Sequence, residues 1–260
     1  MTNRGLQYDR RWMVADENGK FMTQRRFPRM SLIAVSIKDE LRVSAPGMSE
    51  LVVPLVSEGD RTEVEVWGDR TTAIPVGAKS QAWFSQFLGI DCQLVYMPDD
   101  AQRPTEHGKF SPDNLVSFAD AFPYLLISEA SLSGLNEQLQ ARGADPVKMD
   151  RFRPNLVVSG VSEPHEEDAW QQIKIGEATF DLPKLCARCS IPNVNQQTGD
   201  RSKEPTQTLS RYRYWDRGIW FGKNAMQAQA SSQQSAPVLR VGDTVEILSK
   251  QTEPRARRKG

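Results

Sequence analysis

Short stretches of alternating polar and apolar residues dominate the first part of the chain. Residues 62–67, Thr-Glu-Val-Glu-Val-Trp, alternate with a period of two, which is typical of a half-buried strand. An apolar segment at 12–15 leads into Asn18-Gly19, a strong hairpin-turn signal, and predicts a return strand at 21–23. A further strand is predicted at 92–96. Closely spaced strands with Gly, Asp and Pro between them indicate a small barrel or sandwich.

Two segments have helical periodicity instead. In the first, Ser80 is the expected cap, the aromatic residues at 83, 84 and 87 form one face, and Gly89 is the expected end. The second begins at Ser128, carries leucines at 132, 135 and 139, and ends by Gly143. Strands are predicted around it at 122–127 and 155–159, with hairpin-like segments at 174–180 and 238–248. The predicted fold class is therefore mainly β with a few helices, an α+β arrangement.

A polar stretch without periodicity, about 97–114, is the predicted domain boundary. We expect one domain at 1–97 and a second at 106–249. The last segment, 250–260, is short and basic, and we expect it to be a disordered tail.

Composition narrows the class of function. The 260 residues contain 33 Lys+Arg and 33 Asp+Glu, so the charges balance, which argues against a dedicated nucleic-acid binder. Three cysteines are too few for a disulfide scaffold. No segment resembles a secretory signal or approaches the ~20 apolar residues of a membrane span. The expected protein is reduced, soluble and cytoplasmic, with neither a nucleic-acid nor a membrane partner.

The strongest local signal is the pair Cys186 and Cys189, separated by Ala-Arg. A zinc site needs four ligands, yet there is no second pair, and His107 and His165 are far apart in sequence. A thioredoxin-type pair opens a helix, whereas 190–194, Ser-Ile-Pro-Asn-Val, predicts extended chain. Two interpretations stay open: a pair of buried structural thiols, or one thiolate that binds a metal held mainly by a cofactor.

Longer segments carry a resemblance to a known family. Residues 184–189, Lys-Leu-Cys-Ala-Arg-Cys, with Val194, Thr-Gly at 198–199 and Lys-Glu-Pro at 203–205, resemble the signature of the MOSC domain. Segments 118–132, 152–160 and 241–245 are similar to other blocks of that domain, and 8–12 and 23–25 resemble its N-terminal β-barrel companion. The resemblance covers nearly the whole chain and extends to YcbX-type proteins and the mitochondrial amidoxime-reducing component. It implies a small N-terminal β-barrel-like domain followed by a MOSC β-barrel domain.

The resemblance implies an enzyme that carries the molybdenum cofactor, molybdopterin. It assigns Cys189 as the molybdenum ligand and catalytic residue. The residues that it assigns to the cofactor are Arg10, Arg153, Asn155, Ala187, Arg188 and Asn224. The phosphate and dithiolene of the pterin suit guanidinium and amide donors, which these arginines and asparagines supply. Asp168 is expected to be a structural partner of an arginine, and Cys186 and Cys92 are expected to be structural.

The implied reaction is the reduction of small N-hydroxylated substrates: hydroxylamines, amidoximes and N-hydroxylated bases. No cysteine cluster for an iron–sulfur centre follows the domain, so electrons would come from a separate ferredoxin, flavodoxin-like protein or reductase. One alternative is a sulfur carrier with a persulfide on Cys189, served by a pyridoxal-phosphate desulfurase. Another is an inactive truncated remnant.

Two departures from the family pattern bear on these expectations. Members open with a strand that ends in Pro-Val/Ile-Lys-Ser, whereas here Arg4-Gly5-Leu6 leads directly to Tyr8. We therefore expect the first barrel strand to be missing and Arg4 to lie in a frayed terminus. Val194 is followed by Asn195 where the family has Asp.

Overall fold

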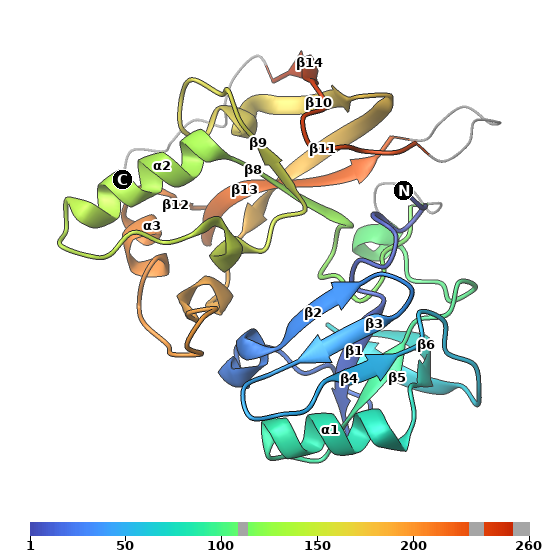
Figure 1. Ribbon diagram of the computed structural model, residues 1–260. Coiled ribbons are helices and arrows are strands. Elements are labelled where there is room, and N and C mark those ends of the chain that lie inside the picture. Colours follow the sequence, from blue (N-terminus) through green and yellow to red (C-terminus); the bar gives the residue numbers. More distant parts are fainter. Residues whose placement is uncertain (109–113, 229–236, 252–260) are drawn as a thin grey trace. The chain divides into compact units, whose positions relative to one another are not determined.

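The computed structural model describes residues 1–108, 114–228 and 237–251, and in these the chain forms two units (Figure 1). The N-terminal unit comprises 7–121 and 194–201. The C-terminal unit comprises 1–6, 122–193 and the chain from 202 onward. Most of the predicted basic tail, 252–260, lies outside the described residues. No helix in the described part of the chain is both long and apolar enough to cross a bilayer.

The N-terminal unit contains two antiparallel sheets. One has the order β1-β7-β6-β5, and the other has the order β2-β3-β4. The strands are β1 (Trp12–Asp16), β2 (Ala34–Ile37), β3 (Leu41–Ser44), β4 (Leu51–Val53), β5 (Thr62–Val66), β6 (Asp69–Pro75) and β7 (Cys92–Tyr96). Strands β3 and β4 alternate strictly between buried and less buried positions. Their buried Leu and Val side chains form a core with the aromatic face of helix α1 (Ala78–Leu88).

The C-terminal unit is built on a curled sheet of order β14-β10-β11-β13-β8-β9, with β12 beside β13 (Figure 1). Its strands are β8 (Tyr124–Ser128), β9 (Leu156–Val158), β10 (Trp170–Ile175), β11 (Ala178–Ala187), β12 (Tyr214–Trp215), β13 (Gly218–Gln227) and β14 (Val245–Lys250). Only the β8–β9 pair is parallel among the pairs in this described sheet. Helices α2 (Glu129–Gln140) and α3 (Thr206–Tyr212) complete the unit.

A buried carboxylate anchors the start of α2. The Ser128 side chain caps the helix by accepting from the Ser131 amide. Glu167, which is 0% exposed, accepts from the Ser128 amide and from both serine hydroxyls. This network satisfies helix donors that would otherwise have no partner. It thereby fixes α2 to the turn that precedes β10.

Gly222 changes which way the side chains of β13 point. Phe221 packs in the cluster that contains Phe152, whereas Ala225 packs in the cluster that contains Tyr124. Residues four apart would share a face in a regular strand. Gly222 has φ +78°, which is typical of a glycine bulge. The bulge therefore sets the face on which Asn224, two residues later, lies.

The predicted fold class is confirmed, and so are the strands at 62–67 and 92–96 and both helices. The predicted cap of α1 is wrong, because Gly77 is the N-cap and the Ser80 hydroxyl donates to its carbonyl oxygen. The return strand at 21–23 is reduced to one bridge, between Ala15 and Phe21.

Three further predictions are wrong. Residues 190–194 are not extended, because Ile191–Asn193 form a 3₁₀ turn. The segment 238–248 is not a hairpin, since only β14 is a strand and it pairs with β10. Arg4 is 4% exposed, and residues 1–6 bond within the C-terminal unit, where the Met1 amine donates to the Pro237 carbonyl.

Candidate functional site

The cysteine pair lies where β11 ends. Pairing with β13 continues one residue past the strand, because the Arg188 amide donates to the Ile219 carbonyl at 2.7 Å. The chain then turns through Cys189 into the 3₁₀ turn Ile191–Asn193. The half-buried Cys189 sulfur accepts from the Ile191 amide at 3.5 Å. The thiol is thus accessible and lies in a turn that is held by its own backbone.

The Arg188 side chain joins this turn to a second segment. Its Nη2 donates to the Phe152 carbonyl at 3.1 Å, and its guanidinium lies over the Phe152 ring. Its Nη1 lies 3.1 Å from the Cys186 sulfur. Its Nε is buried without a hydrogen-bond partner among the described residues. Two of the three guanidinium nitrogens therefore serve the protein, and the third lacks an acceptor.

A second arginine makes the reverse connection. Arg151 is 8% exposed, and its Nε donates to the Pro192 carbonyl at 2.8 Å. Its Nη2 lies 3.5 Å from the Glu204 carbonyl. Burial lowers the pKa of Arg151, and Asp150 opposes that change. Nothing in the sequence distinguishes Arg151 from a surface arginine, and sequence reasoning missed it.

The Arg-Pro-Asn turn, residues 153–155, directly follows Arg151 and Phe152 in the sequence. Arg153 is exposed and has φ +55°, a left-handed backbone. Asn155 makes a two-way connection to β8: its amide donates to the Leu125 carbonyl at 2.9 Å, and its Oδ1 accepts from the Leu125 amide at 3.0 Å. The turn is thereby fixed to the sheet.

Asn224 lies on the same part of the sheet. It is paired with Leu125 of β8 and with Lys184 of β11, and its Nδ2 donates to the Leu185 carbonyl at 3.3 Å. Leu125 is thus a common neighbour of Asn155 and Asn224. Ala187 is exposed at the end of β11, opposite Trp220.

Six of the seven residues that the resemblance assigned therefore belong to the C-terminal unit. Arg10 belongs to the N-terminal unit. It has φ +51°, forms an ion pair with Asp9 at 2.5 Å, and accepts the Phe118 amide on its carbonyl. The functional roles of all seven stay predictions.

Asp168 is the structural partner that was expected. It forms a 2.6 Å ion pair with Arg213, and its carbonyl accepts from the Lys223 ammonium at 2.7 Å. Burial raises the pKa of this carboxyl, and Arg213 opposes the rise. Arg213 and Lys223 are both buried, and no sequence pattern indicated either of them.

Cys92 is also buried, and burial raises the pKa of its thiol, which fits a structural role.

The donor set suits a metal that arrives inside a cofactor. Within the described residues, no three His, Cys, Asp or Glu side chains gather into a protein-only metal site. The half-buried Cys189 directly follows Arg188 in the sequence, the Nε of Arg188 is buried without an acceptor among the described residues, and Arg153 is exposed. A thiolate is a soft ligand, and guanidinium groups bind phosphate. The residues present therefore fit the cofactor.

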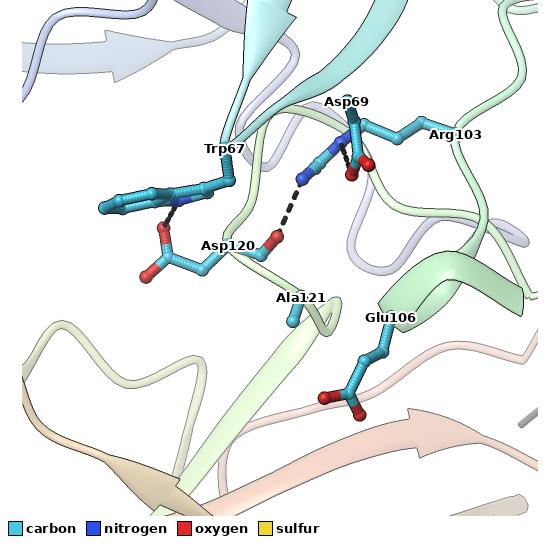
Figure 2. A pocket seen from close by; sticks show the side chains of 6 residues that line it. All are labelled: Trp67, Asp69, Arg103, Glu106, Asp120 and Ala121. Atoms are coloured by element: carbon cyan, nitrogen blue, oxygen red, sulfur yellow. Dashed lines mark hydrogen bonds and ion pairs between the residues drawn. The ribbon is translucent and has the colours of Figure 1, made fainter. Parts of the chain in front are cut away.

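Apart from the cysteine site, a cavity of about 210 Å³ is lined by residues of the N-terminal unit alone (Figure 2). Figure 2 shows the Trp67 indole donating to the Asp120 carboxylate, and Arg103 reaching Asp69 and the Asp120 carbonyl. Arg103 also donates to the carbonyls of residues 117 and 119. Burial lowers the pKa of Arg103, whereas Asp69 and Asp120 oppose that change. Since all these donors bond within the protein, the cavity wall has a structural role.

Comparisons with known proteins point to one family. The family description "MOSC domain" matches residues 113–246, and "MOSC N-terminal beta barrel domain" matches residues 1–91. Mitochondrial amidoxime-reducing component 1 of Mus musculus is 34% identical over 95% of this chain and 75% of its own length. Mitochondrial amidoxime reducing component 2 of Rattus norvegicus is 34% identical over 93% and 73%.

A molybdenum cofactor sulfurase of Oryza sativa subsp. japonica is 34% identical over 85% of this chain. The match spans only 29% of that protein, so the chain corresponds to less than a third of the sulfurases' length. The sulfurase is named for the molybdenum cofactor, and the other two relatives are named for the reduction of amidoximes. The chain therefore belongs to the MOSC-domain family, with both the MOSC domain and its N-terminal β-barrel domain.

Proposed function

We propose that this protein is a molybdenum-cofactor oxidoreductase that reduces N-hydroxylated compounds. The observation that carries the proposal is the joining of the Cys189 turn to the Arg-Pro-Asn turn through Arg188, which keeps a buried nitrogen without an acceptor. The likeness to amidoxime-reducing components over nearly the whole chain supports the choice of substrate class.

Cys189 would hold the metal, and Arg153, Asn155, Ala187, Arg188 and Asn224 of the C-terminal unit would hold the pterin. When bound, the cofactor supplies a centre that exchanges two electrons and an oxygen atom with the substrate. The chain itself orients the group through the fixed turns around Leu125 and Phe152. The exposed face at Arg153 and Ala187 leaves the site open to small substrates.

The overall reaction is balanced by an external reductant. An N-hydroxylated substrate, R–NHOH, takes up two electrons and two protons and gives R–NH₂ and water. The N–O bond breaks, and the oxygen leaves as water. The electrons come from a separate ferredoxin, flavodoxin-like protein or reductase.

Metal and pterin analysis of the purified protein tests the proposal. We expect stoichiometric molybdenum with pterin in the wild type and none of the metal in Cys189→Ala. Cys186→Ala is the matched control, since it alters the other thiol of the pair and should keep part of the metal and of the hydroxylamine reduction. Equal molybdenum content in Cys189→Ala and wild type would exclude Cys189 as the ligand.

The likeness to molybdenum cofactor sulfurases favours one second candidate, a sulfur carrier with a persulfide on Cys189. The same sample distinguishes the two. Sulfur released by cyanide from Cys189, in protein without molybdenum, supports the carrier, for which a pyridoxal-phosphate desulfurase would be the donor. Neither metal nor releasable sulfur would indicate an inactive remnant.

A further inference from the structure

The Cys189 turn and the Arg-Pro-Asn turn are joined by two arginines that point in opposite directions. Arg188 leaves the cysteine turn and donates to the Phe152 carbonyl. Arg151 leaves the other segment and donates to the Pro192 carbonyl, three residues after Cys189. Each segment thus supplies one guanidinium and one carbonyl acceptor. We call these two reciprocal bonds the arginine clasp.

Each side of the clasp is itself attached to the rest of the unit. The Phe152 ring packs on Phe221 with centroids 4.4 Å apart, and Asn155 bonds both ways to Leu125. On the other side, Asn193 accepts from the Thr206 amide on Oδ1, and its own amide donates to the Ser190 carbonyl. The clasp therefore connects two segments that are each hydrogen-bonded to the rest of the unit, and Cys189 lies between its two attachment points on the cysteine turn, Arg188 and Pro192.

We propose that Arg151 is a positioning residue: together with Arg188 it fixes the Cys189 turn against the Arg-Pro-Asn turn, so that the thiol meets the cofactor metal in one place. This inference rests on the proposed function. Arg151 reaches Pro192 and Glu204 from a buried position, so it acts through the turn and not by touching the metal. A ligand held in place in advance avoids an ordering cost when the cofactor binds.

Hydrogen exchange of the full chain without cofactor tests the clasp directly. The reporters are the amides of Ile191 and Asn193, which donate within the turn. Losing one charge-assisted bond should raise local opening, and so the exchange rate of these amides, by about ten- to a hundredfold in Arg151→Ala. Amides of β10 and β14 should keep wild-type rates. Arg211→Ala, an exposed arginine on α3 in the same unit, is the control and should change neither set.

Arg151→Lys adds a variant that keeps the charge. A lysine can donate to the Pro192 carbonyl but lacks the fork that also reaches Glu204. We expect it to fold and to show an intermediate exchange rate, so it decides the question if Arg151→Ala fails to fold. Wild-type exchange of the turn in both arginine variants would overturn the inference. A rise spread evenly over the whole unit would do the same, because it would indicate a purely structural role.

Molybdenum retention forms the second arm. Protein loaded with cofactor is passed through gel filtration, and the molybdenum-to-protein ratio is measured. We expect Arg151→Ala to lose the metal about ten times faster than wild type, with Arg151→Lys between them. Unchanged retention despite faster exchange of the turn would overturn the positioning role. A wild type that binds no molybdenum would instead overturn the proposed function and leave the exchange result to be judged separately.

Discussion

Gly222→Ala is a sharp test of how β13 is built. Gly222 has φ +78°, and an added Cβ would lie 2.7 Å from Cγ1 of Ile127 and 2.9 Å from the Leu126 carbonyl oxygen. The left-handed backbone costs about 1–2 kcal/mol for a residue with a side chain. The contact with a buried side chain and with backbone adds about 1–3 kcal/mol. We expect Gly222→Ala to lower the free energy of unfolding by about 2–5 kcal/mol.

Gly160→Ala separates the destabilisation caused by the close contact from the destabilisation caused by the left-handed backbone. Gly160 has φ +74°, almost the same conformation, and nothing lies within 4 Å of its added Cβ. Urea denaturation followed by circular dichroism gives both values, and Gly222→Ala should be the more destabilised by about 1–3 kcal/mol. Equal losses in the two variants would refute the argument that the close approach to β8 requires glycine. Because Asn224 follows the bulge, Gly222→Ala should also reduce pterin retention, whereas Gly160→Ala should not.

Three further predictions concern single side chains. Arg103→Lys should lower the free energy of unfolding by about 3 kcal/mol in urea denaturation, because lysine cannot replace a buried guanidinium that bonds Asp69 and three carbonyls; a loss below about 1 kcal/mol would contradict this. Burial raises the pKa of Tyr212 to about 12, so the folded state keeps a proton that the unfolded state releases above pH 10, and stability falls as pH rises between those values. Tyr212→Phe should lose less stability over pH 10–12 in urea midpoints than wild type does. Cys186→Ser keeps an acceptor for Arg188 Nη1 and should retain more pterin than Cys186→Ala, and the reverse order would contradict this.

The sequence predicts the regular elements well where periodicity and turn residues agree. The alternation at 62–67 and the aromatic face ended by Gly89 both hold, since each has a pattern and a stop signal. The prediction of a hairpin at 238–248 is wrong, because the local sequence pattern does not show which strand will be the partner. There β14 pairs with β10, about seventy residues earlier in the chain. Strand pairing at such separation is set by the whole sheet.

In the candidate site, too, the sequence predicts the residues with a local motif and misses those whose role depends on distant contacts. Motif residues such as Arg153 and Cys189 stand out in the sequence, and the structure places both in the C-terminal unit. The 3₁₀ turn at Ile191–Asn193 was predicted as extended chain, because its fixing contacts come from Arg151 and Thr206, which lie outside the motif. Contacts between segments that are distant in sequence leave no local pattern, so Arg151 could not have been identified.

The spacing of the cysteine pair follows from the geometry of a strand end. Side chains two apart on a strand lie on the same side, which lets Arg188 Nη1 approach Cys186 while its backbone still pairs with Ile219. Cys186 is half-buried and packs against the core cluster of Phe152 and Phe221. The strand pairing ends at Arg188, and Cys189, the next residue, lies in the turn. The two half-buried thiols therefore differ through their positions relative to the end of β11: Cys186 lies on the strand beside Arg188 Nη1, whereas Cys189 lies in the turn that follows.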